Sequence, residues 1–284
     1  MWIFLCLLSA ITAGFASLIM KKCSENNNAR SIALIGMVTS YILYISLALT
    51  FTDVLKDFNM HTLFYIAPLT ICQMIGYVCG VLSIKYANVS TVIPIRKCNT
   101  IVTLILGIII LNESIPVLKL IISFILIALT IAIVKEEKIL NDNNSKKGIL
   151  FAWLFVLFNG ISSMLNKFYI NTFVNPLIVT FYYSMFGIII LSIYCSITKS
   201  WQYFNIKKLN KAYILFSYIL FDFISNLSYR FCLMDGQVSL AQPIHSSSII
   251  ITIIGSYLIL NEKITKKKLI MIMGVIACVL LISI

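Results

Sequence analysis

Charged residues are scarce in this sequence. Asp, Glu, Lys and Arg together make up 11% of the 284 residues, whereas soluble domains contain about 25%. Apolar residues make up 60% of the chain. This balance excludes an ordinary soluble domain and predicts an integral membrane protein surrounded by a lipid bilayer.

Sequence motifs for catalysis and cofactor binding are also absent. The chain contains no GxxxxGK(S/T) phosphate loop, so we expect no site for ATP hydrolysis. It lacks the HExxH and DDxxD clusters that an intramembrane enzyme would use. The eight cysteines are scattered and form no CxxC pair, which predicts neither a disulfide framework nor a metal site. We therefore expect no enzyme activity and no cofactor.

Basic residues outnumber acidic ones, and the net charge is +12. In a soluble protein this excess would suggest nucleic acid as a partner. Here the lysines and arginines collect in short loops between apolar runs, where they contact lipid headgroups. We therefore expect no nucleic-acid partner. Most of these basic residues lie in the loops that follow odd-numbered runs, so the positive-inside rule favours termini outside the cell.

Apolar runs of about 20 residues, the length that crosses a hydrocarbon core of about 30 Å, follow one another along the chain. None shows the alternation of period two that a membrane β-barrel requires. The first run lacks the basic start of a signal peptide, which predicts a retained span. The connectors leave no room for a catalytic domain outside the membrane. We expect ten spans, at residues 2–20, 31–51, 62–84, 89–111, 115–134, 148–168, 176–198, 212–233, 237–260 and 264–284.

The chain also repeats itself. Val89–Glu113 and Val238–Glu262 both contain Val-Ser, Pro-Ile and Leu-Asn-Glu at matching positions, with an offset of 149 residues. A unit of five spans must invert when it is copied, because an odd number of crossings reverses the starting side. We therefore predict an all-α membrane protein of ten transmembrane helices, built as two inverted five-helix repeats at residues 1–142 and 143–284. Such repeats are typical of secondary transporters.

The segments "YANVSTVIPI…LGIIILNESI" and "GQVSLAQPI…GSYLILNEKI" resemble the signature of the EamA-type family of drug/metabolite transporters. The resemblance implies a ten-helix bundle in the cell membrane, with a substrate cavity lined by spans 1, 3, 4, 6, 8 and 9. It also implies cytoplasmic termini, against the charge bias of the loops. The family often has Gly where this chain has Asn112 and Asn261, and apolar residues where it has Arg96 and Lys97. These departures leave the substrate open.

Arg96 and Lys97 lie inside the fourth apolar run, although a charge at the centre of a span costs about 2.5–3.5 kcal/mol on insertion scales. They could bind an anionic group of the substrate, with Arg96 offering a bidentate fork. One of them could instead pair with a buried acid, or both could snorkel to the interface. Adjacent helical residues differ by about 100° in direction, so we expect at least one, rather than both, to face a cavity.

Asp222, Asn226 and Arg230 form a polar stripe in the eighth span. In the first half of the repeat, Gln73 stands at the position equivalent to Asp222, and Tyr77 at the position equivalent to Asn226. The same face of the span is therefore polar in both halves. We therefore expect Asp222, Asn226 and Tyr77 to line the cavity. Asp222 could contact substrate or carry a coupling proton. Alternatively, it could form a structural ion pair with Arg230 or Arg96.

The position equivalent to Arg96 in the second half is His245, which could carry a coupling proton or act as a hydrogen-bonded packing residue. Gln242 is a further candidate for substrate binding, and Asn99 and Asn159 are weaker ones. Glu113 and Glu262 follow their helices directly, and we expect each to cap the next helix. Several aromatic residues could form a cage for a cation or a ring: Tyr41, Tyr44, Tyr77, Tyr86, Trp153, Tyr182 and Tyr183.

Together these patterns predict a secondary transporter of a small metabolite that works by alternating access. The basic pair favours a carboxylate- or phosphate-bearing substrate, and Asp222 or His245 could couple its movement to protons. Asp222 with the aromatic residues would instead suit a cationic or zwitterionic, choline-like amine. A lipid flippase or a structural membrane partner is the alternative from another class. A monomer and a homodimer fit the sequence equally.

Overall fold

The computed structural model describes residues 1–54, 58–113, 116–118, 121–122, 124–125, 128–129, 132, 143–204, 209–259 and 265–283. Within these residues the chain is helical and contains no strand, so the predicted all-α class is confirmed. The elements are α1 (Trp2–Asn26), α2 (Ala29–Phe51), α3 (Met60–Tyr65), α4 (Ala67–Tyr86), α5 (Val89–Lys97), α6 (Asn99–Leu111), α8 (Asn143–Phe173), α9 (Pro176–Thr198), the 3₁₀ helix η2 (Ser200–Phe204), α10 (Ala212–Asp235), α11 (Val238–Ser246), α12 (Ser248–Ile259) and α13 (Lys266–Ser283).

Eight helical stretches in the described part of the chain are long and apolar enough to cross a membrane. They correspond to eight of the ten predicted spans. The predicted span 264–284 coincides with α13, whose apolar stretch, Leu269–Cys278, is shorter. The predicted span 115–134 lies largely outside the described residues. Large apolar side chains such as Phe4, Ile109 and Ile270 are exposed, as expected where a protein faces lipid.

The fourth span of each half is broken into two helices at equivalent positions. Cys98 separates α5 from α6, and its N–H donates to the carbonyl of Ile95, three residues back, at 2.9 Å. Ser247 separates α11 from α12 and bonds Ile244 in the same way at 3.1 Å. A proline, which lacks a backbone donor, lies four residues before each break. Arg96 and Lys97 therefore occupy the last turn of α5, where the carbonyl groups favour cations.

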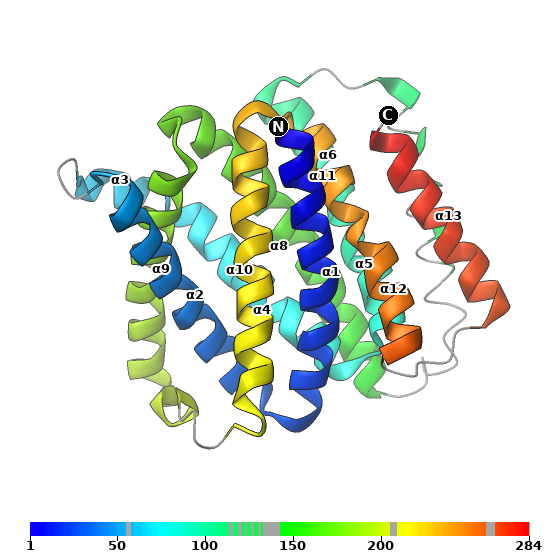
Figure 1. Ribbon diagram of the computed structural model, residues 1–284, viewed down its shortest axis with the longest axis horizontal. Coiled ribbons are helices and arrows are strands. Elements are labelled where there is room, and N and C mark those ends of the chain that lie inside the picture. Colours follow the sequence, from blue (N-terminus) through cyan, green and yellow to red (C-terminus); the bar gives the residue numbers. More distant parts are fainter. Residues whose placement is uncertain are drawn as a thin grey trace.

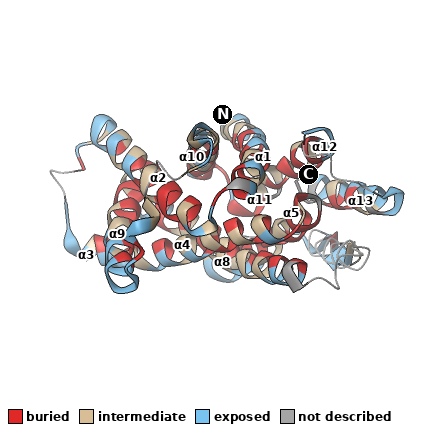
Figure 2. Ribbon diagram, turned by 90° about the horizontal axis from the view of Figure 1, so that it is seen from below, coloured by how far each residue is buried: buried red, intermediate tan, exposed pale blue. Residues whose placement is uncertain are grey.

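The helices of the two halves pack against each other in matched pairs. α1 packs on α10, as α8 packs on α4, and α1 packs on α12, as α8 packs on α6. Figure 1 shows α1 and α10 side by side, with α2 and α9 at one end of the molecule and α13 at the other. Figure 2 shows buried residues on the inward sides of these helices and exposed residues on their outer sides.

Glycine allows two of these helix pairs to approach closely. A Cβ atom at Gly14 would lie 2.8 Å from Cβ of Ile251, and one at Gly160 would lie 2.6 Å from Cβ of Val102. Gly14 and Gly160 are equivalent positions in the repeat, and so are Ile251 and Val102. The carbonyl of Gly160 also accepts a hydrogen bond from Thr103 at 3.3 Å. Small residues commonly mark such contacts in membranes because dispersion, rather than the hydrophobic effect, holds the helices together.

Candidate functional site

A cavity of about 150 Å³ lies between the two halves. Helices α1, α2, α4, α5, α6, α8, α9, α10 and α11 all contribute to its wall. The family resemblance implied a wall from spans 1, 3, 4, 6, 8 and 9, so α2 and α9 are additions. Its charged and amide-bearing residues are Arg96, Lys97, Gln73, Asn99, Asn159, Asp222 and Asn226, and His245 and several hydroxyl-bearing residues line it as well.

Arg96 reaches this cavity from the last turn of α5. Its Cζ lies 4.0 Å from the centre of the Phe155 ring on α8, which is a cation–π contact. Its Nε and Nη1 atoms are buried and have no hydrogen-bond partner among the described residues. Gly80 makes room for the guanidinium, since a Cβ atom there would lie 3.3 Å from Nη2 of Arg96. The arginine is therefore held in place by packing while two of its donor atoms remain available.

Lys97 also lines the cavity, contrary to the expectation that adjacent residues would not both do so. The two side chains do diverge, because Lys97 donates to the hydroxyl of Ser248 on α12 at 2.6 Å. The basic pair therefore joins α5 to two different helices of the other half. These contacts differ from the alternative in which both side chains extend to the membrane interface.

Asn99 and Asn159, the weaker candidates, meet across the cavity wall. Asn99 donates from Nδ2 to Oδ1 of Asn159 at 2.8 Å, which connects α6 with α8. The Oδ1 atom of Asn99 is buried without a partner in the described residues. This bridge lies immediately after the helix break at Cys98, so the broken span supplies both the cation and an amide to the cavity.

Asp222 and Asn226 contribute to the cavity from α10. The side chain of Asn226 donates to the backbone carbonyl of Asp222 at 2.8 Å, which fixes the amide along the helix. Tyr77 and Tyr218 line the cavity with them, and their ring centres lie 6.5 Å apart. Asp222 is only partly buried. The site thus contains a carboxylate next to tyrosine rings as well as the basic pair.

Arg230 does not pair with Asp222, which was one expected arrangement. Its Nη2 atom donates to Oε1 of Gln73 on α4 at 3.1 Å. The guanidinium also packs on two rings, at 4.6 Å from Tyr183 and 5.4 Å from Tyr44. The amide of Gln73 takes the place of the expected carboxylate, and this hydrogen bond joins α10 to α4.

Gln242 lies away from the cavity, so its expected position there is wrong. It is 1% exposed and accepts a hydrogen bond from the hydroxyl of Tyr229 at 2.5 Å. His245, one turn later, does line the cavity. Its Nδ1 atom is 2.9 Å from the Ser9 hydroxyl, and its ring lies 5.0 Å from that of Tyr229. The histidine is thus hydrogen-bonded on the side that faces α1.

Glu113 is a helix cap, but for a helix in the other half of the chain. Its carboxylate accepts hydrogen bonds from the backbone N–H groups of Val238 and Ser239, at 3.1 Å each, at the start of α11. Asn112 makes this possible because it ends α6 in the left-handed conformation, with φ of 52°, that the family's glycine would also adopt. Glu262 lies outside the described residues.

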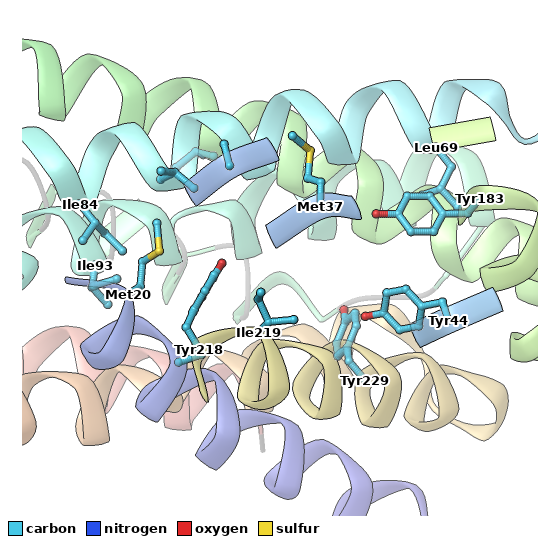
Figure 3. Packing of buried hydrophobic residues seen from close by; sticks show 14 of the residues in the cluster. Met20, Met37, Tyr44, Leu69, Ile84, Ile93, Tyr183, Tyr218, Ile219 and Tyr229 are labelled. Atoms are coloured by element: carbon cyan, nitrogen blue, oxygen red, sulfur yellow. The ribbon is translucent and has the colours of Figure 1, made fainter. Parts of the chain in front are cut away.

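The aromatic wall differs in part from the expected cage. Tyr41, Tyr44, Tyr77 and Tyr183 line the cavity, whereas the expected residues Tyr86, Trp153 and Tyr182 do not. Figure 3 shows Tyr218 extending from α10 toward α4, with Tyr44 and Tyr183 further along the same space. Tyr218 and Phe155 were not expected. Tyr218 lies one turn before Asp222, a spacing that could have indicated it.

Metal ligands do not gather in the described part of the chain. No group of three or more His, Cys, Asp or Glu side chains there is arranged to hold a metal ion. The chemistry available in the cavity is therefore that of guanidinium, ammonium, carboxylate, amide, imidazole and phenol groups.

Comparison with known proteins places this architecture in a family. The model of the EamA-like transporter family matches residues 1–135 and again residues 146–284. No curated protein matches the sequence. A solved structure, titled only as the crystal structure of a protein, superposes with a TM-score of 0.64 at 10% identity and covers 97% of this chain and 96% of its own. This likeness concerns the fold.

Proposed function

The chain belongs to the EamA-like transporter family, and we propose that it is a secondary transporter of a small metabolite that bears a carboxylate or a phosphate. It is a multi-pass protein of the cell membrane. The proposal concerns the substrate class and the mechanism, which the family alone leaves open.

The observation that carries the proposal is the state of Arg96. Buried polar atoms are normally satisfied by hydrogen bonds. The Nε and Nη1 atoms of Arg96 have no partner in the described protein, yet the side chain is fixed against Phe155 beside the cavity. These two atoms point to different sides of the guanidinium, and an anionic group of the substrate would accept a charge-assisted hydrogen bond from either of them. Lys97 would add a second positive charge.

For the mechanism, we propose that residues 1–142 and 143–284 form inverted repeats that rock around the cavity. The matched packing of α1 on α10 and of α8 on α4 supports this symmetry. So does the pair of glycine contacts at Gly14 and Gly160. The breaks at Cys98 and Ser247 supply two equivalent points at which a span can bend. A central site between two such halves is exposed to each side in turn.

Proton coupling is a further part of the proposal, and Asp222 is its main candidate. This carboxylate lines the cavity with Arg96, Tyr77, Tyr218 and Asn226, so a proton taken up there would change the charge that the substrate meets. His245 is the second candidate, since its imidazole also lines the cavity.

A cationic or zwitterionic amine is the second candidate substrate. The observation that favours it is the presence of Asp222 close to tyrosine rings, the arrangement in which ammonium groups are bound. Uptake of a cationic amine would be insensitive to loss of Arg96 and sensitive to loss of Asp222, whereas uptake of a zwitterion would depend on both. Uptake by Arg96→Gln and by Asp222→Asn therefore separates an anionic from a cationic substrate.

The test is uptake of radiolabelled carboxylates, sugar phosphates and quaternary amines by proteoliposomes. Arg96→Gln should abolish uptake of an anion that the wild type carries. Arg30→Gln is the matched control, because Arg30 also packs on a ring, that of Tyr203 at 5.7 Å, but is exposed and outside the cavity. Normal anion uptake by Arg96→Gln would refute the proposal.

A further inference from the structure

A second buried guanidinium, that of Arg230, lies beside the cavity. Arg230 is 1% exposed, the largest of the fully buried side chains. Nη2 donates to Gln73, but Nη1 is buried and has no hydrogen-bond partner in the described residues. Gln73, Tyr44 and Tyr183, the residues that surround the guanidinium, all line the cavity. Arg230 thus contacts three residues of the cavity wall, although it does not line the cavity itself.

The two guanidinium groups lie at different levels along α4. Arg96 lies over Gly80, and Arg230 bonds Gln73, seven residues earlier on the same helix. Seven residues correspond to about 10 Å along a helix axis. Figure 3 shows Tyr44 and Tyr183, which pack on Arg230, toward one end of the view and Ile84 toward the other.

Positive charge exceeds negative charge in this region. Arg96, Lys97 and Asp222 line the cavity and Arg230 adjoins it, so one carboxylate faces three cationic side chains. Guanidinium groups remain protonated in proteins. Buried cations require anionic partners, and Asp222 is the one carboxylate among the described residues that line the cavity. An occupant with two negative charges would balance the region.

The wall between the two arginines is also polar. The hydroxyl groups of Tyr41 and Tyr77 are buried without hydrogen-bond partners in the described chain, and both residues line the cavity. They can donate to oxygen atoms carried by the middle of a bound molecule. A purely hydrocarbon tail would leave these hydroxyls unsatisfied.

We propose that the substrate carries an anionic group at each end of a short, oxygen-bearing carbon chain, with one end bound by Arg96 and the other by Arg230. This inference rests on the proposed function. It narrows the substrate class from an anion to an anion with a negatively charged group at each end. Arg230 acts as a specificity determinant, because a molecule with one anionic group leaves its Nη1 unsatisfied.

The test compares dicarboxylates with their half-esters. Purified wild-type protein is titrated with hydroxylated linear dicarboxylates of increasing chain length (tartrate, xylarate and glucarate) and with a monomethyl ester of each, at neutral pH, and affinity is measured by calorimetry. A hydrogen-bonded charge pair is lost with each ester, so the best dicarboxylate should bind about tenfold or more tightly than its half-ester. Affinity should also pass through a maximum at one chain length.

Two variants locate the second contact. Arg230→Gln should bind the dicarboxylate and the half-ester equally, with the half-ester as tight as in the wild type. Arg96→Gln should weaken both. If Arg230→Gln does not fold, the wild-type series decides the question by itself.

The outcomes separate the two proposals. Equal binding of dicarboxylates and half-esters by the wild type would overturn the two-headed substrate and leave the anion site intact. The same conclusion would follow if folded Arg230→Gln kept the wild-type preference. Binding of neither class, together with binding of a quaternary amine, would overturn the proposed function itself.

Discussion

The guanidinium of Arg96 lies 4.0 Å from the centre of the Phe155 ring, which connects α5 in the first half of the chain to α8 in the second. This contact positions an arginine without using its hydrogen-bond donors. It also explains why a charge can remain within a span, since the ring and the cavity take the place of lipid around it.

Replacing Phe155 with Leu should weaken anion binding without abolishing it. A desolvated cation–π contact contributes about 0.5–2 kcal/mol, so KM for uptake should rise about twofold to thirtyfold while the protein remains folded. Phe151→Leu is the control, because Phe151 lies on the same helix and stacks on Tyr86 outside the cavity. An unchanged KM in Phe155→Leu would show that the ring does not position the arginine.

Asp222→Asn should remove the response of uptake to a pH gradient, because an amide cannot take up the proton. Exchange of labelled for unlabelled substrate without a gradient should persist. Asp235→Asn, at the exposed end of the same helix, should behave as the wild type. If Asp222→Asn still responds to the gradient and His245→Gln does not, the coupling role belongs to the histidine. A response retained by both variants would eliminate proton coupling at this site.

Gly160→Ala should destabilise the protein. The added Cβ would lie 2.6 Å from Val102, and overpacking of this kind costs about 1–3 kcal/mol. Gly14→Ala should have a similar effect through Ile251, because the two sites are equivalent. Gly76→Ala is the control, since the nearest atom to its Cβ would be 3.6 Å away. Thermal unfolding in detergent measures the stability of the three variants. Equal melting temperatures for all three would contradict the close packing of these helices.

Glu113→Gln should lower stability by about 0.5–2 kcal/mol, the range for loss of a helix cap and its charge. The carboxylate bonds Val238 and Ser239 across the two halves, and the amide can accept through one oxygen only. Glu25→Gln removes an exposed acid at the end of α1 and should cause no loss. A melting temperature that is the same for both variants would argue against the cap.

Much of the cavity follows from one rule applied to the sequence. Ionisable and amide-bearing residues in the middle of a span avoid lipid, and this rule places Asp222, Asn226 and at least one of Arg96 and Lys97 at the cavity. The repeat adds Tyr77 by equivalence. The rule fails for Gln242 because its side-chain amide finds a hydrogen-bond partner, the hydroxyl of Tyr229, within the protein.

The remaining features depend on which helices are neighbours in space. Glu113 caps a helix that begins 125 residues later, and Arg230 bonds an amide 157 residues earlier. No local pattern encodes either contact. Phe155 resembles any other aromatic residue in a span, so its position over the guanidinium appears only when α5 and α8 are placed together.

Binding of anions to the purified wild type and to Arg96→Gln tests the central claim most directly. Thermal stability of both proteins should be measured with carboxylates, sugar phosphates and quaternary amines. A ligand at about 100 times its Kd should stabilise the wild type by about 2.7 kcal/mol. We predict that a carboxylate or phosphate stabilises the wild type and leaves Arg96→Gln unchanged. Equal stabilisation of both proteins by that anion would contradict the account.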